Sequence, residues 1–180
     1  EVIERIMDGG NAMVVMPTGS GKSMCFQLPA VAMEGEGTTL VFSPLIALME
    51  DQVVALKARG IDAEYINSTL TKRERERRMK RLAKGAYELI YATPERMQKP
   101  EFVEALRATP GGVRLLAVDE AHCISAWGHD LRPAYAQVGR FRKLLGKPPT
   151  IALTATATPR VRNDIRRVLG MTRETMPLFA

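Results

Sequence analysis

Short, almost uninterrupted runs of apolar residues alternate along the chain with segments of helical character. Six runs are predicted to be strands: Ala12–Met16, Thr38–Phe42, Ala63–Ile66, Glu88–Ala92, Val113–Val118 and Thr150–Leu153. Strands that are apolar on both faces are typical of parallel sheets covered by helices on both sides. The pattern therefore predicts an α/β fold, a three-layer α/β/α sandwich around a mostly parallel sheet.

The clearest predicted helix follows the last of these strands. Over Pro159–Leu169 the apolar residues recur at helical spacing, with Thr158 as the expected N-cap and Gly170 as the expected stop. We expect one domain over residues 1–171. Residues 172–180 show no clear period and are expected to begin a linker or tail.

A second helix, over Thr71–Lys84, carries an unusual charge. Residues 72–84 contain eight basic and two acidic side chains, so this segment accounts for the whole net charge of +6. The predicted inward stripe is Met79, Leu82 and Ala83, and the outward basic face is Arg73, Arg77, Lys80 and Lys84. Such a face either contacts phosphates or is simply solvated, and the sequence leaves both interpretations open.

The remaining composition excludes several classes of protein. The two cysteines, Cys25 and Cys123, lie far apart and outside any CxxC or His-rich context, which argues against a disulfide framework or a zinc cluster and fits a reducing compartment. No apolar run approaches the roughly 20 residues that cross a bilayer, and no secretory signal is recognisable, so we expect no membrane partner.

The first strand runs directly into a glycine-containing loop, Met16–Ser23. A helical stretch, Met24–Val31, is predicted to follow, and the positive end of the helix dipole is expected at Lys22. This strand–loop–helix order is what a phosphate-binding P-loop requires, because the glycines let successive N–H groups face phosphate oxygens. Lys22 is expected to reach the β- and γ-phosphates of ATP, and Ser23 to bind Mg²⁺. Met16 occupies the first position of the P-loop pattern, where the strict pattern has glycine. The predicted nucleotide-binding residues are Thr18, Gly19, Ser20, Gly21, Lys22 and Ser23.

Two adjacent carboxylates, Asp119 and Glu120, follow the strand Val113–Val118. Open α/β sheets place their sites at the carboxyl edge, so these acids are expected to face the P-loop. Asp119 is the predicted second contact to Mg²⁺, and Glu120 is the predicted base that orients the attacking water. Together with Lys22 they form a predicted catalytic set for ATP hydrolysis.

These residues resemble the superfamily 2 helicases over most of the chain. Asp119-Glu120-Ala121-His122 is similar to the DEAH motif, and Ser43–Gln52, Ala92–Arg96 and Leu153–Thr158 resemble motifs Ia, Ib and III. In that family motifs Ia and Ib contact a single strand and motif III links it to ATP. The resemblance implies DNA-binding or coupling roles for Ser43, Pro44, Gln52, Thr93, Pro94, His122, Thr154 and Thr156.

A narrower resemblance rests on the segment after DEAH. Cys123–Tyr135 is similar to the aromatic-rich loop of RecQ-family DNA helicases, which senses single-stranded DNA, and Cys25–Pro29 also resembles RecQ sequences. The loop holds the chain's only tryptophan beside groups that stack on unpaired bases. The coupling residues implied here are Trp127, His129 and Arg132.

The resemblance implies the first RecA-like domain of an ATP-dependent DNA helicase that acts in DNA repair and recombination, with ATP and Mg²⁺ as cofactors. Its expected partners are single-stranded and partly duplex DNA and a second RecA-like domain, which supplies an arginine finger. We expect this chain alone to be monomeric and nearly inactive. The family implies a cytoplasmic, nucleoid-associated protein in a bacterium or a nuclear one in a eukaryote.

Other classes stay open. A different superfamily 2 motor, such as an RNA helicase or a remodelling translocase, would share most of the motifs but not the Trp127–Tyr135 loop. A nucleotide-dependent switch would bind ATP without needing Glu120. A plain DNA-binding domain that used the basic helix would leave the P-loop unexplained.

Overall fold

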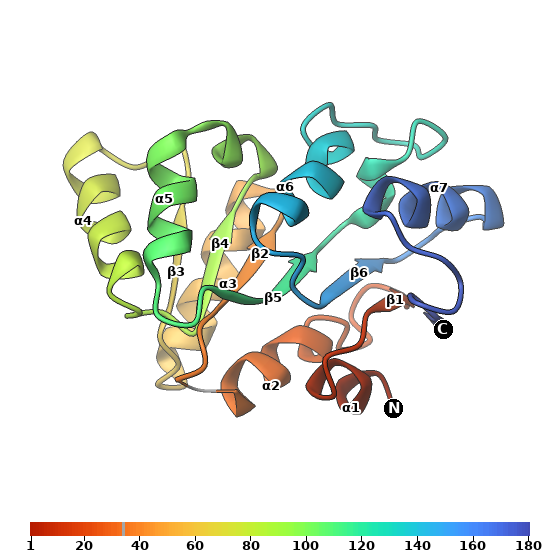
Figure 1. The fold of residues 1–180 in the computed structure, drawn as a ribbon, viewed down its shortest axis with the longest axis horizontal. Helices are drawn as coiled ribbons and strands as arrows, with labels where there is room; N and C mark the ends of the chain where they lie inside the picture. The colour runs from red at the N-terminus through yellow and green to blue at the C-terminus, as the bar shows by residue number, and fades with distance from the viewer. Residues whose placement is uncertain (34) are drawn as a thin grey trace.

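A single parallel sheet forms the middle layer of the molecule (Figure 1). The computed structural model of the chain describes residues 1–33 and 35–180. Seven strands in this part pair in the order β3-β4-β2-β5-β6-β1-β7, and every pair is parallel. The strands are β1 Ala12–Val15, β2 Thr38–Phe42, β3 Ala63–Ile66, β4 Leu89–Ala92, β5 Val113–Val118, β6 Thr150–Thr154 and β7 Leu178–Phe179. The predicted parallel α/β sandwich is confirmed, and the six predicted strands end within about one residue of the observed bounds.

Helices cover both faces of the sheet (Figure 1). One layer consists of α1 Val2–Met7, α2 Met24–Ala32 and α3 Ile46–Ala58, and the other of α4 Lys72–Ala83, α5 Pro100–Ala108, α6 Val138–Leu144 and α7 Pro159–Leu169. Three short 3₁₀ turns, η1 Pro94–Gln98, η2 Ala121–Ile124 and η3 Tyr135–Gln137, lie in the loops. Within the described ranges, none of the helices has the length and apolar character needed to cross a membrane.

Strands β1 to β6 send alternate side chains into two apolar cores, because successive side chains of a strand point to opposite faces. In β2, Leu40 belongs to the core under α4 to α7, and Val41 belongs to the core under α1 to α3. Both side chains are completely buried. This double burial explains why the strands read as continuous apolar runs.

Helix α7 begins and ends at the residues whose capping chemistry predicts its ends. Thr158 caps α7 by accepting a hydrogen bond from the Val161 amide at 3.3 Å, and Gly170 ends it at φ +70°. The helical stretch predicted after the P-loop, Met24–Val31, matches α2 to within one residue, whereas the helix start expected at Lys22 is a turn. The turn at Lys22 is closed by i→i+3 hydrogen bonds, and α2 begins at Met24.

The segment after α7 joins the sheet. β7 pairs with β1, and Met176 just before it is fully buried. The proposed boundary between residues 171 and 172 stays a prediction, but residues 178–179 are part of the same sheet as the P-loop strand.

Helix α4 has a buried arginine that the sequence pattern did not distinguish from its basic neighbours. Leu82 is buried as predicted, while Met79 and Ala83 pack against the same core. Arg78 also faces inward, where its guanidinium lies 2.7 Å from the carboxylate of Glu64 in β3 and 2.9 Å from Glu74. Glu64 is also bound by Lys57 at 2.6 Å. The charge of Arg78 is therefore paired with carboxylates of the domain. The side chains of the predicted basic face remain exposed: Arg73, Arg77, Lys80 and Lys84.

Replacement of Glu64 by Gln is expected to lower the free energy of unfolding by about 2 kcal/mol, because Arg78 would lose its buried counter-charge and keep only the more exposed Glu74. Equilibrium urea unfolding measures the change. The matched control is Glu76→Gln, whose partner Lys72 lies 3.9 Å away on the surface. That change is expected to cost less than about 0.5 kcal/mol. Equal effects of the two substitutions would contradict this account of α4.

Candidate functional site

The loop between β1 and α2 has the backbone geometry of a phosphate cradle. Gly19 and Gly21 adopt φ values of +79° and +82°, which a side chain would disfavour. Met16 extends β1, since its amide donates to the Thr154 carbonyl at 3.1 Å and its side chain packs on the core. The Lys22 ammonium folds back over the loop and donates to the Met16 carbonyl at 3.3 Å. The loop therefore tolerates methionine at its first position and keeps Lys22 above the exposed residues 17–21.

Asp119 is the most buried carboxylate of the predicted catalytic set, with 7% of its surface exposed. Its amide continues the sheet by donating to the Phe42 carbonyl at 2.9 Å, and its Oδ1 accepts from the Glu120 amide at 3.0 Å. Burial first, and the charge of Glu120 second, raise the pKa of Asp119 to about 6, while Lys22 acts in the opposite direction. A cation beside Asp119 would offset that burial cost, so the residue fits a divalent metal site.

Glu120 leaves the strand through a left-handed backbone conformation, with φ +50° and ψ +46°. This region is costly for a residue with a side chain and is found mostly where the surrounding structure enforces it. The turn redirects the chain into η2 and leaves the Glu120 carboxylate partly exposed at 26%. Asp119 and Glu120 thus have different environments, one buried and one accessible to a water molecule.

His122 connects Glu120 to the end of β6. Its Nδ1 lies 2.8 Å from the Thr154 hydroxyl and 3.3 Å from Glu120 Oε2. Burial lowers the pKa of His122, so the ring is neutral near pH 7. The Thr154 hydroxyl donates to the Thr156 carbonyl at 3.1 Å, which leaves Nδ1 of a neutral His122 as the donor toward Thr154 and Glu120. These contacts physically join the acidic pair to the segment predicted as motif III.

The loop after η2 continues this connection to the surface. His129 stacks on His122, with ring centroids 4.2 Å apart. Trp127 is 59% exposed, which excludes a role as a core anchor. Arg160, at the start of α7, covers one face of the indole, with its guanidinium carbon 3.2 Å from the ring centroid. Arg132 pairs with Asp130 at 3.2 Å.

Two residues of this region escaped the sequence analysis. Tyr135 is buried, and its hydroxyl donates to the Asp119 carbonyl at 3.2 Å, so it fixes the loop to the acidic strand end. Its aromatic character inside a polar loop was a usable signal. Arg160 carried no such signal, because its contact with Trp127 depends on the approach of α7 to the loop.

The residues predicted from motifs Ia and Ib are only partly brought together. Pro44 and Thr93 line a cavity of about 330 Å³ together with Arg132, at the carboxyl edge of β2 and β4. Ser43 and Pro94 are buried and do not line it, and neither does Gln52. Thr154 is fully buried, so it can act on a strand only through its neighbours, whereas Thr156 is exposed.

A further group of potential ligands, His122, Cys123 and Asp130, has its ligand atoms within 4.8 Å of one another. Burial raises the pKa of the Cys123 thiol to about 11, and Asp130 is already paired with Arg132. The group is therefore a poor metal site, because a thiol must lose its proton to bind a metal.

Comparison with known proteins agrees with this geometry. A family model described as DEAD/DEAH box helicase matches residues 1–165. The chain belongs to the DEAD/DEAH box helicase family. This helicase domain is 52% identical over 165 residues to the ATP-dependent DNA helicase RecQ of Bacillus subtilis, covering 91% of the chain and 27% of that protein. It is 45% identical over 172 residues to the probable ATP-dependent DNA helicase RecS of the same organism, covering 95% and 34%. The predicted RecQ resemblance is confirmed.

The fold is shared with solved helicase structures. The helicase domain of Hef from Pyrococcus furiosus superposes with a TM-score of 0.71 at 23% identity, covering 98% of this chain and 37% of that chain. The chain thus spans about a third or less of the curated relatives described above. The roles of the individual site residues stay predictions.

Replacement of Asp119 by Asn is expected to stabilise the metal-free domain at pH 8. The pKa of Asp119 is raised from 3.8 to about 6 in the folded state, so ionisation between these values costs the folded state free energy as the pH rises. The variant should gain roughly 2–3 kcal/mol over the parent at pH 8 and almost nothing at pH 4. Urea unfolding in the presence of a chelator measures this. A variant less stable than the parent at pH 8 would contradict the claim that burial destabilises the ionised Asp119 carboxylate.

Proposed function

We propose that this domain binds ATP with Mg²⁺ and hydrolyses it as half of a DNA helicase motor. The observation that carries the proposal is the chain of contacts from Glu120 through His122 to Thr154, at the sheet edge where the P-loop also lies. These contacts join the proposed hydrolytic carboxylate to the segment that resembles motif III, which in the family links the strand to ATP.

The P-loop supports the binding half of the proposal. Residues 18–21 are exposed and residues 22–23 are half-buried, so the amides of this loop could donate to phosphate oxygens. Lys22 would exchange its hydrogen bond to the Met16 carbonyl for a γ-phosphate oxygen. Ser23 and Asp119 would hold Mg²⁺, which neutralises charge on the phosphates when it is bound. The raised pKa of Asp119 fits that role, since the metal would restore its ionised form.

Glu120 supports the hydrolytic half. Its carboxylate is accessible, and it would orient a water molecule and accept its proton. The Nδ1 of His122 lies 3.3 Å away, so any movement of His122 changes the hydrogen bonding of Glu120. The His129 stack and the Trp127 loop are attached to that same histidine ring. A strand that displaces the loop would therefore change the alignment of the base.

Single-stranded DNA is the proposed activator, and partly duplex DNA is the substrate of the complete protein in repair or recombination. Trp127 presents an exposed ring for base stacking, and Pro44, Thr93 and Arg132 border a cavity that a strand could follow. We propose that a second RecA-like domain supplies the cation that completes the site and the closure that drives stepping. The protein would act where the cell keeps its DNA, the nucleoid in a bacterium or the nucleus in a eukaryote.

Substitutions at Lys22 and Glu120 are expected to separate binding from turnover. In the full-length protein, Lys22→Ala should weaken binding of ATP·Mg²⁺ at least tenfold, because a charge-assisted contact to the β- and γ-phosphates is lost. Glu120→Gln should retain binding and reduce turnover by about a hundredfold or more. Fluorescent-nucleotide titration and single-turnover hydrolysis measure the two quantities. Equal weakening of binding by both substitutions would refute this division of roles.

Loss of the Trp127 ring is expected to uncouple hydrolysis from DNA. Trp127→Ala should leave DNA-independent hydrolysis nearly unchanged and reduce its stimulation by single-stranded DNA about tenfold, since base stacking contributes roughly 1–3 kcal/mol. Trp127→Phe keeps a stacking face and should preserve most of the stimulation. Steady-state hydrolysis with and without oligonucleotide gives the ratio. An unchanged ratio in Trp127→Ala would refute the coupling role, and stronger stimulation by RNA would favour an RNA helicase.

A further inference from the structure

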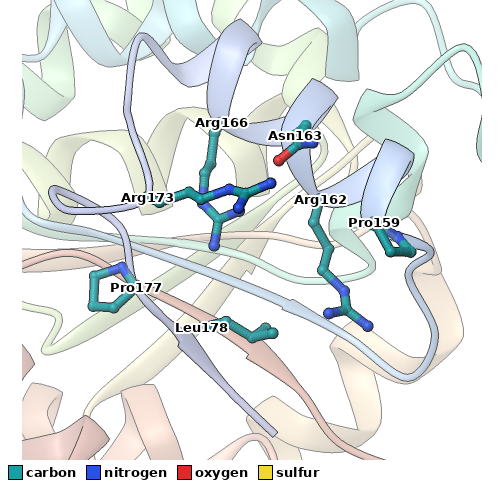
Figure 2. A pocket seen from close by; sticks show the side chains of 7 residues that line it. All are labelled: Pro159, Arg162, Asn163, Arg166, Arg173, Pro177 and Leu178. Atoms are coloured by element: carbon teal, nitrogen blue, oxygen red, sulfur yellow. The ribbon is translucent and has the colours of Figure 1, made fainter.

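Three arginines line a cavity of about 400 Å³ between α7 and the start of β7 (Figure 2). β7 is the edge strand at the opposite end of the sheet from β3. Arg162 and Arg166 project from α7, and Arg173 reaches over from the segment that follows it. Pro177 and Leu178 form an apolar wall opposite them. The remaining lining residues are Pro159 and Asn163.

The charges of these arginines are not balanced by neighbouring acids. In residues 1–33 and 35–180, none of the three guanidinium groups forms an ion pair with a carboxylate. By contrast, the neighbouring Arg167 on the same helix pairs with Asp164. Glu174 is the acid that acts on Arg166, and its influence is smaller than that of Arg173 or Arg162. Like charges thus accumulate at this cavity.

Arg166 is the best-held member of the cluster. Only 7% of its surface is exposed, and its Nε donates to the Met176 carbonyl at 2.9 Å. Burial, followed by the charges of Arg173 and Arg162, lowers the pKa of Arg166. Arg162 is fixed in a similar way, because its Nε donates to the Ala157 carbonyl at 2.8 Å. Two guanidinium groups that line the cavity are therefore held in place by backbone carbonyls.

From this arrangement we propose that the cavity is an anion site for a phosphate ester. Guanidinium groups match the geometry of phosphate oxygens and bind them through paired hydrogen bonds. The apolar wall of Pro177 and Leu178 would accept the organic part of the ester, which a site for a bare inorganic ion would not need. The site is separate from the P-loop, whose residues do not line the cavity, and it goes beyond the proposed function.

The position of Arg162 gives the site a route to the helicase machinery. The carbonyl that holds it belongs to Ala157, one residue beyond exposed Thr156 in the motif III segment. A phosphate bound to the Arg162 guanidinium would change the hydrogen bond from Arg162 to the Ala157 carbonyl and so act on this segment, which reaches His122 through Thr154. Phosphodiester in a nucleic-acid strand and free phosphate compounds share the required chemistry, and the test separates them.

The test uses inorganic pyrophosphate without divalent metal, titrated by calorimetry into the Lys22→Ala variant so that binding at the P-loop is suppressed. Binding should persist in that variant. Adding Arg162→Gln or Arg173→Gln should weaken it about tenfold, because each removes a charge-assisted contact. Adding Arg167→Gln, which neutralises an arginine of the same helix whose charge is already paired, should leave it unchanged.

Absence of pyrophosphate binding in Lys22→Ala would overturn the proposal, and so would equal weakening by all three arginine substitutions. Because Arg166 also supports the fold, it is changed only to Lys, with circular dichroism to verify folding. In the second arm, a labelled oligothymidylate is titrated by fluorescence anisotropy into the variants with intact Lys22. Weaker binding in Arg162→Gln and Arg173→Gln supports the site with a strand as its ligand. Unchanged strand affinity, with the pyrophosphate effect retained, supports it with a free phosphate compound. Neither arm requires ATP hydrolysis, so the result is independent of the proposed function.

Discussion

The parallel direction of every strand in the sheet is the constraint on which the site depends. Because parallel strands end at the same edge, the P-loop after β1, the acids after β5 and Thr154 at the end of β6 are brought together, although about a hundred residues separate the first two along the chain. β6 lies between β1 and β5, so Thr154 stands between the phosphate cradle and Glu120. The fold itself thus places the residue that links them.

Burial at this edge gives the two acids different properties. Asp119 is enclosed, and its ionised form is costly without a cation, whereas Glu120 is turned outward by a left-handed backbone and remains accessible. The Nδ1 atom of His122 contacts both Glu120 and Thr154, and the His122 ring stacks on His129 of the surface loop. The acidic pair, the motif III segment and the exposed loop are therefore joined through one histidine ring.

Much of the fold could be predicted from the sequence, because its signals are local. Strands buried on both faces are continuous apolar runs, and Thr158 and Gly170 define the ends of α7 by their own chemistry. The contacts of long basic side chains could not be predicted in the same way. Arg78, Arg160 and Arg166 resemble other basic residues in the sequence, and their partners Glu64, Trp127 and the Met176 carbonyl are set by packing between distant elements. The helix start expected at Lys22 is replaced by a turn, because the P-loop backbone, rather than residue propensity, delays the first α-helical hydrogen bond to Ser23.

We propose that Ser23 and Asp119 jointly bind the metal of a nucleotide held by the P-loop. Anomalous diffraction from crystals of the domain grown with Mn²⁺ and a non-hydrolysable ATP analogue tests this site. We expect a single strong peak between the Ser23 hydroxyl and the Asp119 carboxylate, next to the β- and γ-phosphates. A peak at His122, Cys123 and Asp130 instead, or nucleotide phosphates bound away from residues 18–23, would contradict it.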